Sequence, residues 1–356
     1  MQLEGIPARR RLSGRQKRGL GLAVSIAVVA AVFLLALPRI ADYRDVWGVV
    51  QELGWREWLA IAGAVLLNLA TFPPPWMAAL PGLRFRQALA MTQASTALAI
   101  VSPAGAAVGM AGSYAMLRSW GFARGPVGLA VAVTGIWNQF ANLAFPVLAL
   151  ALVTAEGQKH PALQTVALVG VAVLSVAAIV FAVALWSARY ARRIGDRTAA
   201  LANGVLRVVR RGPVSWAGES LAHFRAGALD LLRRRWHVLT LSTLVGHLTV
   251  FVVLLVCLRA VGTTGDEITW VEAFASWALV RALGAFPITP GGVGVIELGL
   301  SAALIAFGAP NPEAVAATLL YRAFTVLPTL GLGLLAAATW RTHHPGRSLD
   351  PPHTEP

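Results

Sequence analysis

Apolar residues in this chain gather into long stretches that short charged connections separate. Six of the stretches are each long enough to cross about 30 Å of hydrocarbon as one α-helix. They cover 20–37, 58–80, 126–153, 162–187, 236–261 and 314–338. The pattern therefore predicts an all-α polytopic membrane protein with about six full crossings.

Two further apolar stretches, 87–118 and 271–308, are interrupted near their middles. The interrupting residues are Ser102, Pro103 and Gly105 in the first stretch, and Thr289, Pro290, Gly291 and Gly292 in the second. Each arm is shorter than the roughly 20 residues that a spanning helix needs. We therefore expect two broken re-entrant helical hairpins, with tilted pairs of short helices as the alternative.

The two broken stretches share one spacing of small and apolar residues. The matching positions are Pro103, Gly105, Gly112, Leu117 and Gly121 in the first stretch and Pro290, Gly292, Gly299, Leu304 and Gly308 in the second. A chance match is the alternative to a duplication. Together with the flanking crossings, the stretches define units 58–153 and 236–338, which we expect to be inverted repeats.

Charge placement gives the expected orientation. The formal net charge is +14, from 30 Lys and Arg against 16 Asp and Glu. With a cytoplasmic N-terminus, the cytoplasmic pieces hold 23 basic and 6 acidic residues, and the opposite side holds 5 and 9. This positive-inside bias favours a cytoplasmic membrane location and excludes a nucleic-acid partner. The Arg-rich, Lys-poor composition suggests a prokaryotic source.

The predicted organisation is a membrane domain between two cytoplasmic tails. The tails cover 1–19 and 341–356, and the membrane domain covers 20–340. Within it, the basic segment 188–235 is expected on the cytoplasmic side. An ordinary basic loop is one interpretation of this segment, and an amphipathic helix on the inner leaflet is the other.

Apart from residues at the edges of the segments, such as Arg259 and Glu272, three charged residues fall within the predicted membrane: Arg281, Glu297 and Arg322. A charge near the bilayer centre costs at least about 3 kcal/mol, so each is expected to face an interior cavity and a partner. Either arginine could pair with Glu297. Alternatively an arginine could bind a lipid phosphate while Glu297 binds a cation or a proton.

Polar residues at the breaks and in the helices add candidate chemistry. Ser102 or Thr289 could cap a helix, and the free N–H groups of a half-helix could bind an anion. Asn142 and His247 are expected to form hydrogen bonds between helices, although Asn142 could also line a polar path. The sequence predicts no metal site and no cofactor, and its single Cys257 excludes an internal disulfide.

The run from Pro290 to Glu297 resembles a known family. Pro290, Gly291, Gly292, Gly294 and Glu297 match the P-G-G-[IVL]-G-x-x-E element of the flippase-like membrane region of lysylphosphatidylglycerol synthases. The run from Ser102 to Gly109 is similar to the looser first-half element of that family, but Ala104 and Met110 depart from it. The resemblance implies movement of a lipid between leaflets, without the soluble domain that makes the aminoacylated lipid.

We therefore expect a lipid translocase for an anionic or phosphate-bearing lipid, and no enzyme activity. The candidate substrate-binding residues are Arg281, Glu297, Arg322, Pro290, Gly291, Gly292, Gly294, Ser102, Pro103 and Gly105. The expected partner is a membrane phospholipid or lipid-linked substrate. A scaffold for an envelope-biosynthesis enzyme is the main alternative, and a membrane transferase is a third.

Overall fold

The computed structural model describes residues 34, 37–102, 105–157, 161–186, 218–284 and 289–340. These residues form helices and the turns between them, with no strand in the described ranges. Both tails and most of the expected crossing 20–37 lie outside the described residues. The same holds for Pro103 and for most of the basic segment 188–235.

The helices follow the apolar stretches closely. They are α2 (Leu37–Ile40), α3 (Tyr43–Gln51), α4 (Trp55–Thr71), α5 (Pro73–Ala79), α6 (Phe85–Val101), α7 (Gly105–Ser119), α8 (Arg124–Ala155), α9 (Pro161–Trp186), α11 (Gly218–Ala260), α12 (Trp270–Gly284), the 3-10 turn η2 (Pro290–Gly292), α13 (Val295–Ala306) and α14 (Asn311–Thr339).

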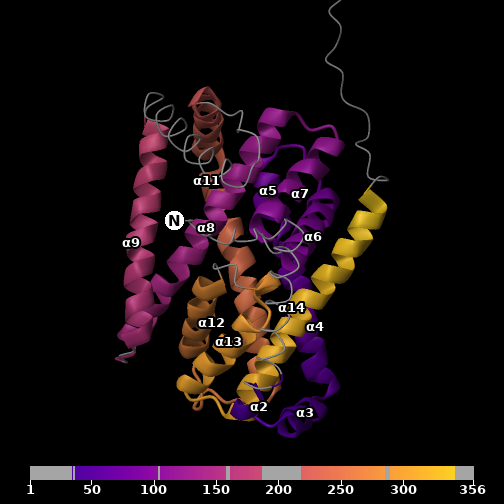
Figure 1. The fold of residues 1–356 in the computed structure, drawn as a ribbon, viewed down its shortest axis with the longest axis vertical. Coiled ribbons are helices and arrows are strands. Elements are labelled where there is room, and N and C mark those ends of the chain that lie inside the picture. Colours follow the sequence, from indigo (N-terminus) through magenta and orange to yellow (C-terminus); the bar gives the residue numbers. More distant parts are fainter. Residues whose placement is uncertain are drawn as a thin grey trace, which may run out of the picture.

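Four helical segments of the described chain are long and apolar enough to cross a membrane. They are Trp55–Ala79, which joins α4 and α5, then Arg124–Ala155, Phe224–Ala260 and Asn311–Thr339. The helix α9 adds a shorter apolar stretch at Leu168–Val183 and lies beside α8 (Figure 1). The all-helical, multi-pass prediction is confirmed, while the number of six crossings stays a prediction.

Both interrupted stretches fold as pairs of packed helices. The arms α6 and α7 pack together in the upper half of the bundle, and α12 and α13 pack together in the lower half (Figure 1). Each pair belongs to a separate buried apolar cluster, one built around Met91 and Leu117 and the other around Trp277 and Leu304. The helical breaks are therefore where the sequence predicts them.

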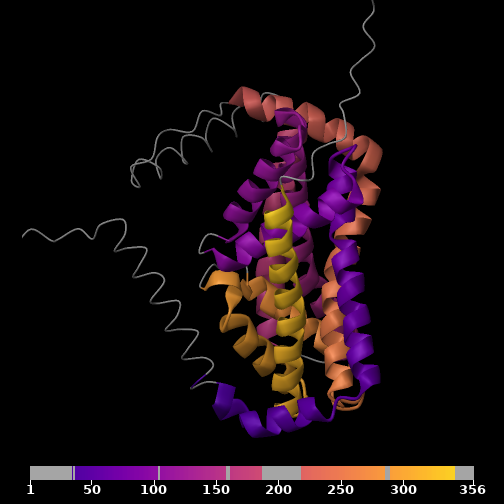
Figure 2. The same cartoon turned by 90° about the vertical axis from the view of Figure 1, so that its right-hand side faces the viewer.

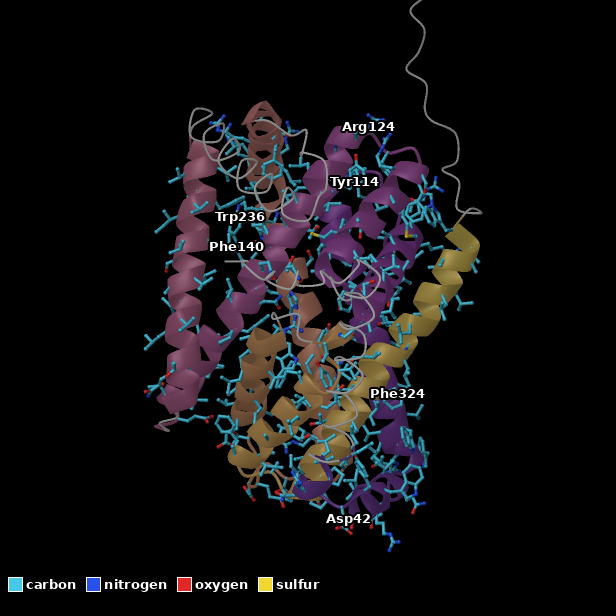
Figure 3. The ribbon with its side chains drawn as sticks, viewed as in Figure 1. Asp42, Tyr114, Arg124, Phe140, Trp236 and Phe324 are labelled. Atoms are coloured by element: carbon cyan, nitrogen blue, oxygen red, sulfur yellow. The ribbon has the colours of Figure 1, made fainter. Side chains whose placement is uncertain are left out.

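Opposite charges mark the two ends of the bundle. Arg124 begins α8 at one end, and Asp42 caps α3 at the other (Figure 3). The loop between α11 and α12 lies at the Asp42 end and contains Asp266 and Glu267. The charge asymmetry read from the sequence is therefore also an asymmetry of the folded bundle.

The helix α11 begins earlier than the sequence predicts. Its 43 residues would span about 65 Å at 1.5 Å per residue, twice the hydrocarbon thickness. Figure 2 shows that its first part lies across the end of the bundle before the helix turns along the bundle's length. Ala228 and Leu231 are buried while Arg233 to Arg235 are exposed. This part of the basic segment is thus an amphipathic helix, not a loop.

The helix α14 connects the two halves. It packs against α6 of the first hairpin and α13 of the second, as well as against α11. Gly333 allows the close approach to α6, because an added Cβ would lie 2.5 Å from the Ala97 Cβ and 2.9 Å from the Gln93 carbonyl oxygen. A larger residue there would push the helices apart.

Candidate functional site

The second break is a tight loop that only glycine can form. Gly291, Gly292 and Gly294 have φ angles of 61°, 68° and 86°, in the left-handed region where other residues are strained. The helical start at Pro290 lasts for a single 3-10 turn, and α13 begins only at Val295. The P-G-G-V-G sequence therefore specifies a backbone shape.

Glu297 and Arg322 hold this loop in place. One Glu297 carboxylate oxygen accepts from the Arg322 Nε at 2.8 Å, and the other accepts from the Gly294 N–H at 2.6 Å. The Arg322 Nη2 also donates to the Gly291 carbonyl oxygen at 2.9 Å. We call this set of contacts between α14, α13 and the loop the Glu297 clasp. It shows which arginine pairs with Glu297, a choice that the sequence left open.

The clasp changes two expectations about the break. The N–H group of Gly294, expected to be free for an anion, already donates to Glu297. The expectation that Thr289 caps a helix through its side chain is wrong, because its hydroxyl instead donates to the Val293 carbonyl oxygen at 2.8 Å. The glycine backbone conformations bring the Gly294 N–H to Glu297 and the Thr289 hydroxyl to the Val293 carbonyl oxygen. These polar groups of the loop are therefore already hydrogen-bonded within the protein.

The first break lies against the second. An added Cβ on Gly291 would lie 2.9 Å from the Ile100 Cγ2 and 3.1 Å from the Ile100 carbonyl oxygen, so the loop touches the last turn of α6. Ser102 ends α6 in an extended conformation. Gly105 begins α7. A Cβ added to Gly105 would lie only 2.5 Å from the Ala99 carbonyl oxygen, so α7 starts in close contact with the end of α6. The hairpin tips therefore meet.

Arg281 lies in a different environment on α12. Its Nη2 donates to the Asn142 Oδ1 at 2.7 Å and lies 2.8 Å from the His247 Nδ1, while its Nε donates to the same Asn142 oxygen at 3.3 Å. The guanidinium carbon lies 4.8 Å from the centre of the Trp277 ring, a cation–π distance. We call these four residues the Arg281 centre. Arg281 does not reach Glu297.

The sequence matches a known family over most of its length. Residues 20–333 match the family described as the lysylphosphatidylglycerol synthase TM region. The chain belongs to this family. No curated protein matches the sequence. Membership of the lysylphosphatidylglycerol synthase TM-region family makes this a membrane protein related to lipid modification or translocation, in the part of those synthases that is not catalytic.

Charge compensation differs between the two arginines of this family member. Both carboxylate oxygens of Glu297 are used in the clasp, so Arg322 has a counter-ion. No described carboxylate pairs with Arg281, since the ion pairs found in the described ranges join Arg322 to Glu297 and Arg234 to Asp230. Arg281 thus keeps its positive charge without a counter-ion from the described chain.

Sequence reasoning noted Asn142 and His247 only as general hydrogen-bonding residues and missed Trp277. Asn142 and His247 stand 139 and 34 positions from Arg281, so no local spacing could link them. Trp277 precedes Arg281 by one helical turn, which was a usable signal for a cation–π contact. In the described part of the chain, no cluster of three or more His, Cys, Asp or Glu could hold a metal ion.

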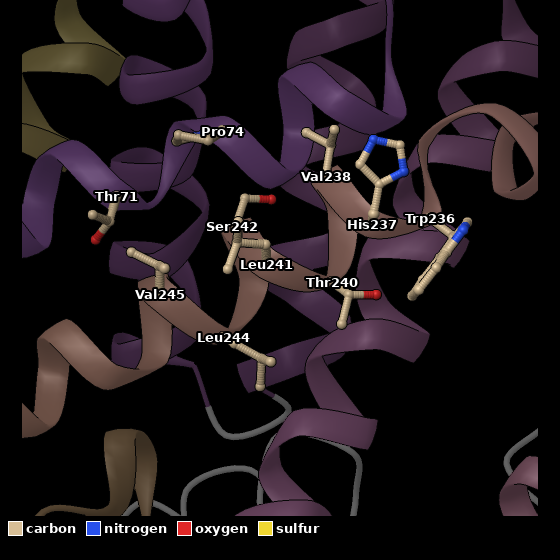
Figure 4. A pocket seen from close by; sticks show the side chains of 10 residues that line it. All are labelled: Thr71, Pro74, Trp236, His237, Val238, Thr240, Leu241, Ser242, Leu244 and Val245. Carbon is tan, nitrogen blue, oxygen red and sulfur yellow. The ribbon is translucent and has the colours of Figure 1, made fainter.

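The structure also has an open groove of about 500 Å³ on α11. Its lining is almost entirely apolar and comes from one stretch of α11 together with the α4–α5 junction (Figure 4). The lining residues are Thr71, Pro74, Trp236, His237, Val238, Thr240, Leu241, Ser242, Leu244 and Val245. None of the predicted site residues lines this groove.

Proposed function

We propose that this protein is a lipid translocase of the cytoplasmic membrane that moves an anionic or phosphate-bearing lipid between leaflets. The observation that carries the proposal is the contact between the two broken hairpins, made by Gly291 and the last turn of α6. Broken helices that meet at one depth are a recurring transporter plan, because rocking of one half on the other opens a shared site to either side.

The two hairpins support an inverted repeat through matched local geometry. Leu117 and Leu304 are both fully buried, and Gly121 and Gly308 both take positive φ, at 89° and 118°, just beyond the second arm. The N–H of the residue after each glycine donates to the carbonyl oxygen of the matched leucine, at 3.3 Å and 3.1 Å. The same helix ending at the same offset is expected from a duplicated unit.

The predicted site residues take separate roles in this proposal. Arg281 and Arg322 are the candidates to meet the headgroup phosphate, since a guanidinium fork matches phosphate geometry. Glu297 is the candidate for coupling to a proton or an ion. Protonation of its carboxylate would loosen both the Arg322 pair and the Gly294 contact, which would free the loop to change shape.

The proposed orientation follows from the charged ends of the bundle. The Arg124 end faces the cytoplasm and the Asp42 end faces outward. Both termini are then cytoplasmic, as is the amphipathic start of α11.

The test is leaflet movement in vesicles that contain only this protein. A fluorescent phosphatidylglycerol should cross faster than in protein-free vesicles, and Gly292→Leu should abolish the increase because position 292 requires a positive φ. The matched Gly331→Leu variant should transport normally, since an added Cβ there meets nothing within 4 Å. No movement by a folded protein, together with a copurifying envelope enzyme, would instead favour a scaffold.

A further inference from the structure

The open groove on α11 has the depth of one membrane leaflet. Its lining on this helix extends from Trp236 to Val245, which is about 14 Å at 1.5 Å per residue. The hydrocarbon of one leaflet is about 15 Å deep, half of the bilayer core. Thr71 and Pro74 of the α4–α5 junction form the other side of the groove (Figure 4). An extended acyl chain therefore matches the groove in length.

Exposed arginines lie at one end of this groove. Arg233, Arg234 and Arg235 directly precede Trp236, and all three are exposed. The Arg234 Nε donates to the Asp230 Oδ1 at 2.9 Å, so this charge has a counter-ion. In the described ranges, neither Arg233 nor Arg235 forms an ion pair. Two positive charges therefore remain without a partner within one helical turn of the groove.

Trp236 indicates the depth of this end of the groove in the membrane. Its side chain lines the groove and is 58% exposed. Tryptophan is typical of the boundary between hydrocarbon and headgroups, because its ring is apolar while its N–H is polar. Figure 2 shows that the part of α11 before the groove lies across the end of the bundle. The arginines are thus at the level of lipid phosphates, and the groove is at the level of acyl chains.

We propose that this groove binds one anionic phospholipid of the adjacent leaflet, with an acyl chain along α11 and the phosphate at Arg233 and Arg235. This leaflet is the cytoplasmic one in the proposed orientation. None of the candidate substrate-binding residues lines the groove, so the site is separate from the hairpins and goes beyond the proposed function. The bound lipid fixes the amphipathic start of α11 to the membrane surface.

Net charge decides which lipid the site prefers. A guanidinium binds a phosphate through charge-assisted hydrogen bonds, which orient the headgroup. Each arginine at the membrane surface favours an anionic lipid by about fivefold. With Arg233 and Arg235 both unpaired, we expect a preference of about 25-fold for a lipid with one net negative charge over a lipid with none.

The test is photolabelling of the full-length protein in phosphatidylcholine vesicles. The probe is either a phosphatidylglycerol or a phosphatidylcholine with a diazirine on one acyl chain, and the labelled peptides are mapped by mass spectrometry. The phosphatidylglycerol probe should label the segment from Trp236 to Val245 about 25-fold more than the phosphatidylcholine probe. Equal labelling by the two probes, or no labelling of this segment, would overturn the proposal.

Charge variants test the arginines. Arg233→Gln and Arg235→Gln should each lower the preference by about fivefold. Arg124→Gln is the matched control, because it removes a basic residue at the same end of the bundle but outside the groove. It should leave the preference unchanged. A preference that survives the loss of both Arg233 and Arg235 would refute the phosphate contact.

A steric variant tests the acyl chain. Leu241 lines the groove and is 65% exposed, so Leu241→Trp should fill the groove without disturbing the core and should abolish labelling by both probes. Leu248 is also exposed on α11 but lies outside the lining, and Leu248→Trp should label like the wild type. Undiminished labelling of the Leu241→Trp protein would show that the chain does not lie in the groove.

The fates of this proposal and of the translocase can be separated. Gly292→Leu, which should abolish lipid movement, should keep the labelling, because position 292 lies in the hairpin loop and not in the groove. Loss of labelling in a folded Gly292→Leu protein would overturn the claim of a separate site. Labelling without lipid movement by the wild type would refute the translocase alone, and lipid movement without labelling would refute the groove site alone.

Discussion

The Glu297 clasp predicts an unusual pattern of stability in a pair of variants. The side chains of Glu297 and Arg322 are only 5% and 14% exposed, so the ion pair is poorly screened by water. Removing one charge from a buried pair costs about 3–5 kcal/mol, because the remaining charge is stranded. Glu297→Gln keeps an oxygen that can accept from the Gly294 N–H, so its main effect is to strand Arg322.

The double variant Glu297→Gln with Arg322→Met should recover most of that loss. It leaves no stranded charge, and buried pairs can often be replaced by uncharged residues at little cost. What remains missing is the hydrogen bond from the Arg322 Nη2 to the Gly291 carbonyl oxygen, worth about 1 kcal/mol. The double variant should therefore be more stable than Glu297→Gln alone.

The chain contains its own reporter for this measurement. Cys257 is the single cysteine and is fully buried, so a thiol-reactive dye will label it only as the protein unfolds in detergent. Glu52→Gln, at an exposed position, is the control for loss of a carboxylate. A double variant that melts lower than Glu297→Gln alone, or Glu297→Gln melting like the wild type, would refute the clasp.

Three other predictions follow from single positions. Gly308→Ala should destabilise the protein by about 1–2 kcal/mol in the same dye assay, because its φ of 118° strains any residue with a Cβ. Gly333→Leu should lower the melting temperature more than Gly331→Leu, since only position 333 is in close contact with another helix. An impermeant thiol reagent should label Thr264→Cys but not Gly125→Cys from outside the cell, and the reverse pattern would refute the orientation.

Much of the fold could be predicted because the local sequence is enough to identify a membrane helix. An apolar run of sufficient length becomes a helix, since the backbone must satisfy its own hydrogen bonds in lipid. The breaks at Ser102 and at Thr289 to Gly292 were also local, because proline and glycine interrupt helices wherever they stand. The amphipathic start of α11 was left undecided, since only contact with the bundle buries Ala228 and Leu231.

In the candidate site, too, some features could be predicted from the local sequence, whereas others depend on how the helices pack. The sequence alone placed Arg281, Glu297 and Arg322 in the interior of the membrane segments and left open which arginine pairs with Glu297. Only the tertiary structure decided which arginine that is. The packing of α14 beside the break places Arg322 on Glu297 across 25 positions, and the packing of α12 against α8 places Arg281 beside Asn142 across 139. Such pairings depend on how helices lie against one another in space, which no spacing along the chain encodes.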